Sequence, residues 1–169
     1  MAEFLASQGY QVEIADPLEA GLPFPQISDW TQSKLEHEII VVSVPISGTS
    51  EILSLLADRQ PSGLIVDVGS LKTPLEEGFK LLVKSGCRVT SIHPMFGSDT
   101  RLLSGRHVIF VDVGVKEATK EAQSLFASTT AELINMSLIE HDRLIAYVLG
   151  LSHALNLAFF TALSESGEL

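Results

Sequence analysis

Three residues with chemically useful side chains follow apolar runs of the chain. Ser70 comes after the run that ends at Val68, His93 follows the run 87–92, and Asp16 follows the short stretch 11–15. An imidazole titrates near working pH, which suits His93 to proton transfer. A histidine taken alone is more often a buried, hydrogen-bonded residue, but the presence of Ser70 and Asp16 at similar positions favours catalysis.

Asp16 has the position of the acid that holds the adenosine ribose in dinucleotide-binding folds. It is followed by Pro17, Leu18 and Glu19, with no neighbouring cation that would accept a 2′-phosphate. The sequence therefore favours NAD over NADP as the cofactor. The alternative is an exposed aspartate that opens a turn before the proline.

Further cofactor contacts are predicted where two other runs end. Pro45 stops a strand ladder, so the backbone at Ser43 and Val44 would face a ligand there, although a plain strand terminator gives the same pattern. Gly69 allows close backbone approach, and Ser70 could cap the next helix while its hydroxyl serves the site. Lys72 in a first helical turn opposes the helix dipole, which hints at an anionic substrate.

The last apolar stretch, 144–163, carries Ser152, His153 and Asn156 in its middle, which is costly in lipid. A helix buried in protein or at a subunit interface is the preferred interpretation. His153 is then a candidate substrate contact, or else a structural hydrogen-bond partner of a neighbouring chain. His141 is expected to cap the helix or pack near its start. No spacing of these histidines predicts a metal site.

The candidate residues can form one site only if the fold places the ends of the predicted strands side by side. Strand-like and helix-like segments alternate up to residue 136, which predicts an α/β fold with a parallel sheet and helices on both faces. Ligands bind at the carboxyl ends of strands in such sheets. The predicted strands are 11–15, 39–44, 63–68, 87–92, 107–111 and 131–135, and the helices are 46–57, 74–84, 115–128 and 140–162.

Composition narrows the function classes. The 169 residues are 46% hydrophobic and 19% charged, and the formal net charge is −10. This charge argues against a nucleic-acid partner, whose binders carry basic surfaces. The single cysteine, Cys87, cannot form an internal disulfide, and the start lacks the basic region of a signal peptide. We expect a cytoplasmic location and no membrane partner.

The chain resembles the prephenate dehydrogenases, which share their fold with the arogenate dehydrogenases. The matching motifs are SVPI at 43–46, DVGSLK at 67–72, HPMFG at 93–97, and HD at 141–142 followed by SHALNLAF at 152–159. The resemblance implies a Rossmann-like domain over 1–136 and, over 137–169, the first long helix of an α-helical dimerisation domain. It implies a homodimer formed through this helix.

By the same resemblance, NAD⁺ accepts a hydride from C4 of prephenate, the ring carboxylate leaves as CO₂, and 4-hydroxyphenylpyruvate forms on the route to tyrosine. His93 would draw the proton from the 4-hydroxyl. Ser70 would orient His93 and touch the hydroxyl or the nicotinamide, and His153 would meet the substrate from the dimer helix. Arogenate, or another hydroxyacid, is the alternative substrate.

Relatives begin with a strand and a Gly-rich phosphate loop, and the family's first strand lies between the strands 11–15 and 39–44. Counting back from Asp16 passes Met1 before reaching that loop. We therefore expect a chain that is incomplete at both ends, an open middle of the sheet, weak NAD binding and impaired activity. A non-catalytic interaction or regulatory fragment is the other alternative.

Overall fold

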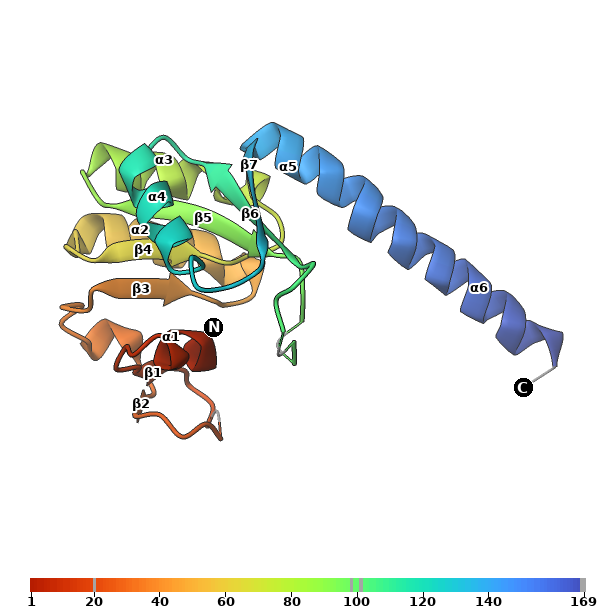
Figure 1. Cartoon of the computed structure of the whole chain (residues 1–169), viewed down its shortest axis with the longest axis horizontal. Coiled ribbons are helices and arrows are strands. Elements are labelled where there is room, and N and C mark those ends of the chain that lie inside the picture. Colours follow the sequence, from red (N-terminus) through yellow and green to blue (C-terminus); the bar gives the residue numbers. More distant parts are fainter. Residues whose placement is uncertain (20, 98, 101, 168–169) are drawn as a thin grey trace.

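The computed structural model describes residues 1–19, 21–97, 99–100 and 102–167. Its main sheet has five strands in the order β3-β4-β5-β6-β7 (Figure 1). The apolar, β-branched segments of the sequence form the buried strands, as expected for a sheet covered on both faces. The strands are β3 (Ile39–Val42), β4 (Leu64–Asp67), β5 (Val89–Pro94), β6 (His107–Asp112) and β7 (Glu132–Ser137).

The sheet is mostly, but not wholly, parallel. β3, β4 and β5 are parallel neighbours, β5 pairs antiparallel with β6, and β6 pairs parallel with β7. The prediction of an all-parallel sheet is therefore wrong at one boundary. A parallel neighbour needs a crossover, usually a helix, and no helix is described between β5 and β6.

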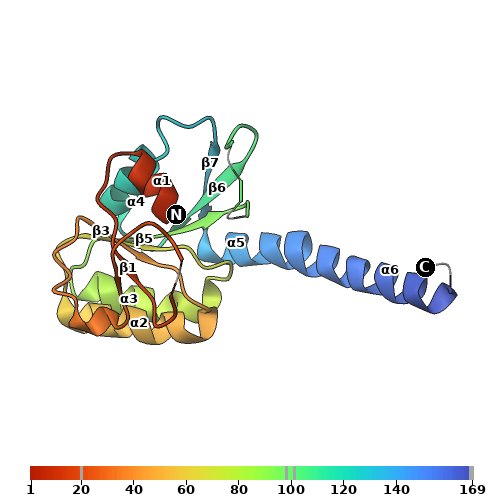
Figure 2. The ribbon, with the colours of Figure 1, turned by 90° about the horizontal axis from the view of Figure 1, so that it is seen from below.

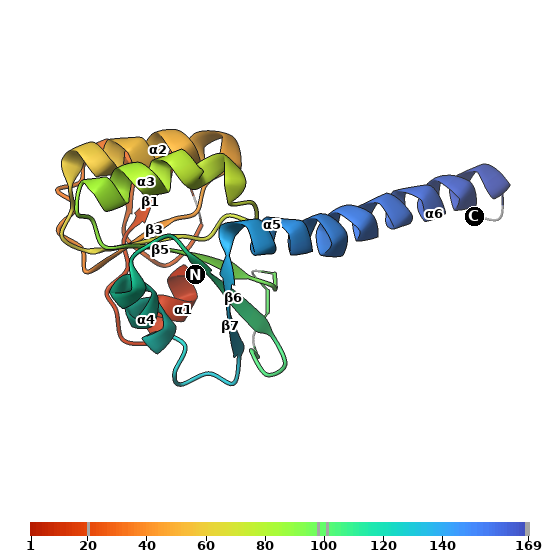
Figure 3. The same ribbon diagram turned by 90° about the horizontal axis from the view of Figure 1, so that it is seen from above.

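Helices cover both faces of this sheet (Figures 2 and 3). On one face lie α2 (Ile46–Arg59) and α3 (Glu76–Lys84), and on the other lie α1 (Ala2–Ser7) and α4 (Lys116–Ser124). A short 3₁₀ turn, η2 (Thr73–Leu75), precedes α3. Two apolar clusters form the core, one on each side of the sheet. The first includes Leu53, Leu56, Phe79 and Leu82, and the second includes Val108, Phe110, Ala122 and Phe126.

A separate two-stranded parallel sheet is formed by β1 (Ile14–Ala15) and β2 (Gln26–Ile27), followed by η1 (Trp30–Gln32). In the described residues neither strand pairs with β3. A cavity of about 920 Å³ lies between the two sheets, lined by α1, by the chain from Gly9 to Asp16, and by the edge strand β3. This cleft lies where the sequence predicts an open middle of the sheet.

The chain ends in one long helical rod that projects from the α/β unit (Figure 1). It consists of α5 (Leu138–Ile145), a π-helical segment η3 (Ala146–Leu151) and α6 (Ser152–Ser166). Ser137 and Glu140 form a capping box at its start. By length and composition alone the rod could span a bilayer. The expectation of a buried helix is not met within this chain, because no described residue of α6 is buried.

Candidate active site

Strand register places the predicted site residues along one edge of the sheet. Val42, Asp67 and Ser91 are aligned across β3, β4 and β5. The residues that follow them, including Ser43, Gly69 and His93, therefore meet at the carboxyl edge of three parallel strands. With about 4.8 Å between neighbouring strands, Ser43 and His93 are roughly 10 Å apart, a span that a bound ligand can bridge.

His93 belongs to β5 itself and forms part of a hydrogen-bonded chain in which both imidazoles are buried. Its Nδ1 lies 2.9 Å from Nε2 of His141, and Nδ1 of His141 lies 2.7 Å from Oδ1 of Asp142. The Asp142 carboxylate also accepts the backbone N–H of Lys72 at 3.0 Å and that of Thr73 at 2.6 Å. His141 is fully buried and His93 is 7% exposed. The first turns of α5 are thus tied to the loop after β4 and to the end of β5.

The other nitrogen of the His93 ring is available. Nε2 has no hydrogen-bond partner among the described residues. Within that part of the chain, every fully buried side-chain nitrogen or oxygen has a partner, so Nε2 reaches solvent. The fold therefore fixes one side of this imidazole and presents the other side at the sheet edge.

Burial and charge set the protonation of this group. The pKa of His93 is lowered from 6.5 to about 4, mainly by burial, and the nearby Lys72 ammonium and His141 contribute to the same shift. Burial also lowers the pKa of His141. For Asp142, burial acts to raise the pKa, but hydrogen bonds from Thr73, His141 and Lys72 outweigh it and hold the pKa below its usual value. At neutral pH the two imidazoles are uncharged and Asp142 is a carboxylate.

Lys72 is not placed as the sequence suggests. Its side chain is fully buried, and Nζ donates to Oδ2 of Asp67 at 2.7 Å and to the carbonyl of Ile92 at 2.8 Å. A substrate contact needs an accessible ammonium, and this one is committed to a carboxylate inside the sheet. We correct that prediction, because Lys72 holds the carboxyl ends of β4 and β5 together beneath His93.

Ser70 lies in the loop between β4 and η2 and is exposed. Its hydroxyl caps neither η2 nor α3, whose N-cap residues are Lys72 and Leu75. No hydrogen bond joins it to His93 in the described residues, and His141 occupies the orienting position that the family resemblance implies for Ser70. The neighbouring Gly69 donates its N–H to Oδ1 of Asp67 at 2.9 Å, which shapes the loop.

Three of the five residues predicted to contact NAD line the large cleft, whereas Pro45 and Gly69 are not among its lining residues. Asp16, Ser43 and Val44 all border it. Oδ1 of Asp16 also accepts the N–H of Leu18 at 2.8 Å, so the turn-forming role is present as well. Pro45 is the N-cap residue of α2. Asp16, after β1, and Ser43, after β3, thus face the cleft from its two sides.

His153 is not near this site within one chain. It is exposed on α6, twelve residues beyond His141. At 1.5 Å per residue, these two histidines are about 18 Å apart along the helix axis. A contact between His153 and a ligand at His93 would therefore need a second copy of the chain.

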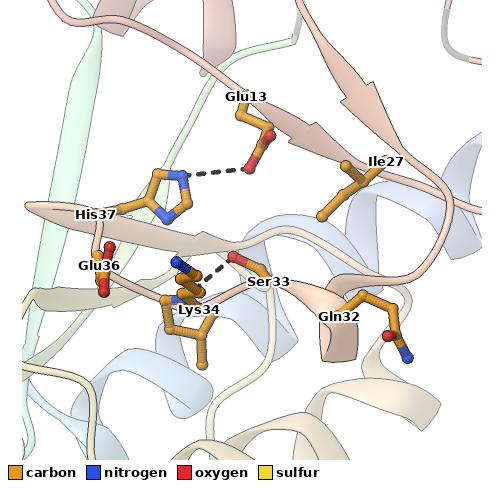
Figure 4. A pocket seen from close by; sticks show the side chains of 8 residues that line it. Glu13, Ile27, Gln32, Ser33, Lys34, Glu36 and His37 are labelled. Atoms are coloured by element: carbon orange, nitrogen blue, oxygen red, sulfur yellow. Dashed lines mark hydrogen bonds and ion pairs between the residues drawn. The ribbon is translucent and has the colours of Figure 1, made fainter.

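A second hollow, of about 380 Å³, lies at the opposite end of β3, away from His93. Figure 4 shows Glu13 and His37 facing one another across it, with Nε2 of His37 3.3 Å from the Glu13 carboxylate. Both side chains are more than one third exposed, so this is a surface ion pair. Both residues also line the large cleft, at the end of β3 away from His93.

Sequence reasoning missed the roles of His141 and Asp142. The signal was present: Ser137-x-x-Glu140 is a capping box, which starts the helix at Leu138 rather than at Glu140. His141 and Ile145 lie one turn apart on the same face of this helix, and both are buried. The pair His141-Asp142 then points toward the sheet domain.

Comparison with known proteins agrees with this geometry. Residues 10–135 match the family described as prephenate dehydrogenase, nucleotide-binding domain. A Lactococcus lactis prephenate dehydrogenase is 32% identical over 132 residues, covering 71% of this chain and 36% of that protein. The T-protein of Enterobacter agglomerans is 27% identical over 167 residues, covering 96% of this chain and 41% of that protein.

Among solved structures, prephenate dehydrogenase from Aquifex aeolicus in complex with hydroxyphenyl propionate and NAD⁺ has a TM-score of 0.80 at 19% identity. The alignment covers 97% of this chain and 64% of that one. At this identity the likeness shows the fold alone. The chain spans about two fifths of the length of the two curated relatives. On the match of residues 10–135, the chain belongs to the prephenate dehydrogenase family, through its nucleotide-binding domain.

Proposed function

We propose that the chain acts in the NAD⁺-dependent oxidative decarboxylation of prephenate to 4-hydroxyphenylpyruvate, a step toward tyrosine. The observation that carries this proposal is the uncharged His93, whose Nε2 is open at the carboxyl edge of a nucleotide-binding sheet. A base in this state can accept a hydroxyl proton at neutral pH.

The cleft fits the cofactor by its chemistry. Asp16 offers a carboxylate to a ribose, while Ser43 and Val44 lie at the end of the facing strand. Gly69 follows at the next strand end, nearer to His93. When bound, NAD⁺ supplies the hydride acceptor. The residues of this chain would hold its adenosine end in the cleft and leave room for its other end beside His93.

His93 performs the proton transfer in this scheme. The substrate's 4-hydroxyl donates its proton to Nε2 as the C4 hydride departs. Loss of CO₂ then leaves the electron pair of the broken C–C bond in the ring, which becomes aromatic, and the resulting phenolate takes the proton back from His93. Atoms and charge balance, so the protein needs only to position C4 and handle one proton. The exposed hydroxyl of Ser70, on the adjoining loop, is proposed to contact the substrate hydroxyl or the nicotinamide.

We also propose that the rod Leu138–Ser166 pairs with a second copy in a cytoplasmic homodimer. Large apolar side chains cover it, and Leu151, Leu155 and Phe159 are more than half exposed at i, i+4, i+8 spacing. A helix with this much exposed apolar surface is stabilised by a protein partner. Such pairing would let His153 of one copy approach the substrate at the other copy. We assign no nucleic-acid or membrane partner.

The proposed function is tested by following NADH formation at 340 nm with millimolar prephenate, arogenate and small hydroxyacids. We expect slow NADH formation with prephenate, or with arogenate, and none with the hydroxyacids. The Lys80→Gln variant is a control, because Lys80 is an exposed residue of α3 whose ion pairs with Glu76 and Glu77 lie on the surface and which lines neither cavity. Oxidation of a small hydroxyacid alone would contradict the assignment.

A further inference from the structure

We propose that His141 and Asp142 are positioning residues that fix the tautomer of His93, so that Nε2 is always the proton-accepting nitrogen. This inference rests on the proposed function in one respect, namely that Nε2 accepts the proton of the substrate hydroxyl. The hydrogen-bonded chain His93–His141–Asp142 is itself a feature of the folded protein.

The chain is anchored at Asp142. Its carboxylate receives the backbone N–H groups of Lys72 and Thr73, which face it from the loop before α3. These donors belong to the backbone and cannot turn away, so the carboxylate is held in one orientation. A carboxylate only accepts hydrogen bonds, and Nδ1 of His141 at 2.7 Å must therefore carry a proton.

The proton on His141 determines the proton on His93. A neutral imidazole has one N–H and one acceptor nitrogen, so Nε2 of His141 is the acceptor. Nδ1 of His93, 2.9 Å away, must then donate. Nε2 of His93 is left with its lone pair, and it is the nitrogen that reaches solvent. The orientation of the Asp142 carboxylate thus determines the tautomers of both buried imidazoles through two hydrogen bonds.

The surrounding charges agree with this order. Lys72, from the β4–η2 loop, disfavours a charged His93, whereas Asp67 on β4 and Asp142 on α5 favour it. Burial is the largest influence on both imidazoles and keeps them neutral. When His93 accepts a substrate proton, its Nδ1–H already donates to His141. The positive charge of the protonated His93 therefore forms on a ring that is already correctly oriented and does not have to rotate.

Long-range ¹H–¹⁵N NMR of histidine side chains in the 169-residue chain tests the proposal directly. We expect Nδ1 of His93 to be the protonated nitrogen and Nε2 the unprotonated one at pH 7. In Asp142→Asn, the amide oxygen can still accept from the backbone N–H groups, and its NH₂ then faces His141. Both imidazoles are expected to switch tautomer, which leaves His93 with a proton on Nε2.

A second variant guards against misfolding. In His141→Gln the amide oxygen can accept from Nδ1 of His93, and we expect the wild-type tautomer to be kept. His37→Asn is the control for an unrelated histidine. A wild-type His93 protonated on Nε2 would overturn the proposal, and so would an unchanged tautomer in folded Asp142→Asn.

Kinetics provide a readout that a purely structural role would not affect. In any preparation with turnover, Asp142→Asn is expected to lower kcat by about 10²-fold or more, with KM nearly unchanged. If no dehydrogenase turnover exists but the tautomer switches as described, the proposed function fails and the positioning role stands. Unchanged kcat in Asp142→Asn would overturn the positioning role while leaving the dehydrogenase intact.

Discussion

The buried pair Lys72–Asp67 allows one stability prediction to be worked out from the structure. Lys72→Met keeps most of the side chain's volume and removes the ammonium. Oδ2 of Asp67 then loses a donor at 2.7 Å, while Ser91 still donates to Oδ2 at 2.8 Å and Gly69 still donates to Oδ1 at 2.9 Å. Both members of the pair are fully buried, so the carboxylate is left without a countercharge.

Breaking a buried ion pair in this way typically costs about 3–5 kcal/mol. Two hydrogen-bond donors remain on Asp67, so we expect a loss near the lower end, about 3 kcal/mol in the free energy of unfolding. For a chain of this size the melting temperature would fall by roughly 6–12 °C. The double variant Asp67→Asn/Lys72→Met removes both charges, and we expect it to be within about 1–2 kcal/mol of the wild type.

Urea unfolding followed by circular dichroism at pH 7 measures the wild type, Lys72→Met, Asp67→Asn and the double variant. The coupling between the two sites is the deciding quantity, because it separates a charge left unpaired from a simple loss of packing. If Lys72→Met lost under 1 kcal/mol, or if the double variant were less stable than the single one, the buried pair would not hold β4 and β5 together as described.

Three further predictions concern pH, association and the cofactor. The pKa of His93 is about 4 when folded and 6.5 when unfolded, so the unfolded state binds more protons between these values and stability falls as pH drops through this window. The full shift is worth about 3 kcal/mol, and we expect a loss of about 2 kcal/mol because Nε2 reaches solvent. Urea titrations at pH 7 and pH 4.5 measure this loss, and we expect His93→Asn to lose less stability than the wild type between the two. By light scattering, we expect the wild type to be dimeric and the double variant Leu155→Glu/Phe159→Glu to be monomeric. Each of these exposed side chains contributes about 1.5–3 kcal/mol when it is buried in an interface. A monomeric wild type would contradict the pairing. Calorimetric titration with NAD⁺ is expected to give roughly millimolar binding, about −4 kcal/mol. A pyrophosphate is usually held by a Gly-rich turn at a helix N-terminus, and in the described residues the helix that borders the cleft, α1, has Met1 rather than such a turn at its start. Micromolar binding would contradict this.

The sequence predicts the elements of this fold better than their pairing. The uninterrupted apolar segment of β4 and the helical spacing of α2 are local patterns, and both elements lie within a few residues of the predicted ranges. The direction of β6 depends on the path of the chain after Pro94, which no local pattern encodes. The two residues of β2, directly after Pro25, have too little pattern to identify a strand.

In the site, too, some features follow from local sequence patterns and others depend on tertiary packing. His93 and the strand ends around it follow from residue type and position. The burial of Lys72 does not, because its charge suggests the surface, and only the ion pair with Asp67, five residues earlier at the end of β4, makes an interior position favourable. The partner of His93 lies 48 residues away in another element, so its contact is set by tertiary packing.

The central claim is that Nε2 of His93 faces the place where the substrate ring binds. NMR of the histidine ring protons, during titration with 4-hydroxyphenylpyruvate in the presence of millimolar NAD⁺, tests it most directly. We predict that the His93 signal moves in a saturable way while the signal of His37 stays in place. A His93 signal that does not move, when other resonances show that the ligand has bound, would contradict the account.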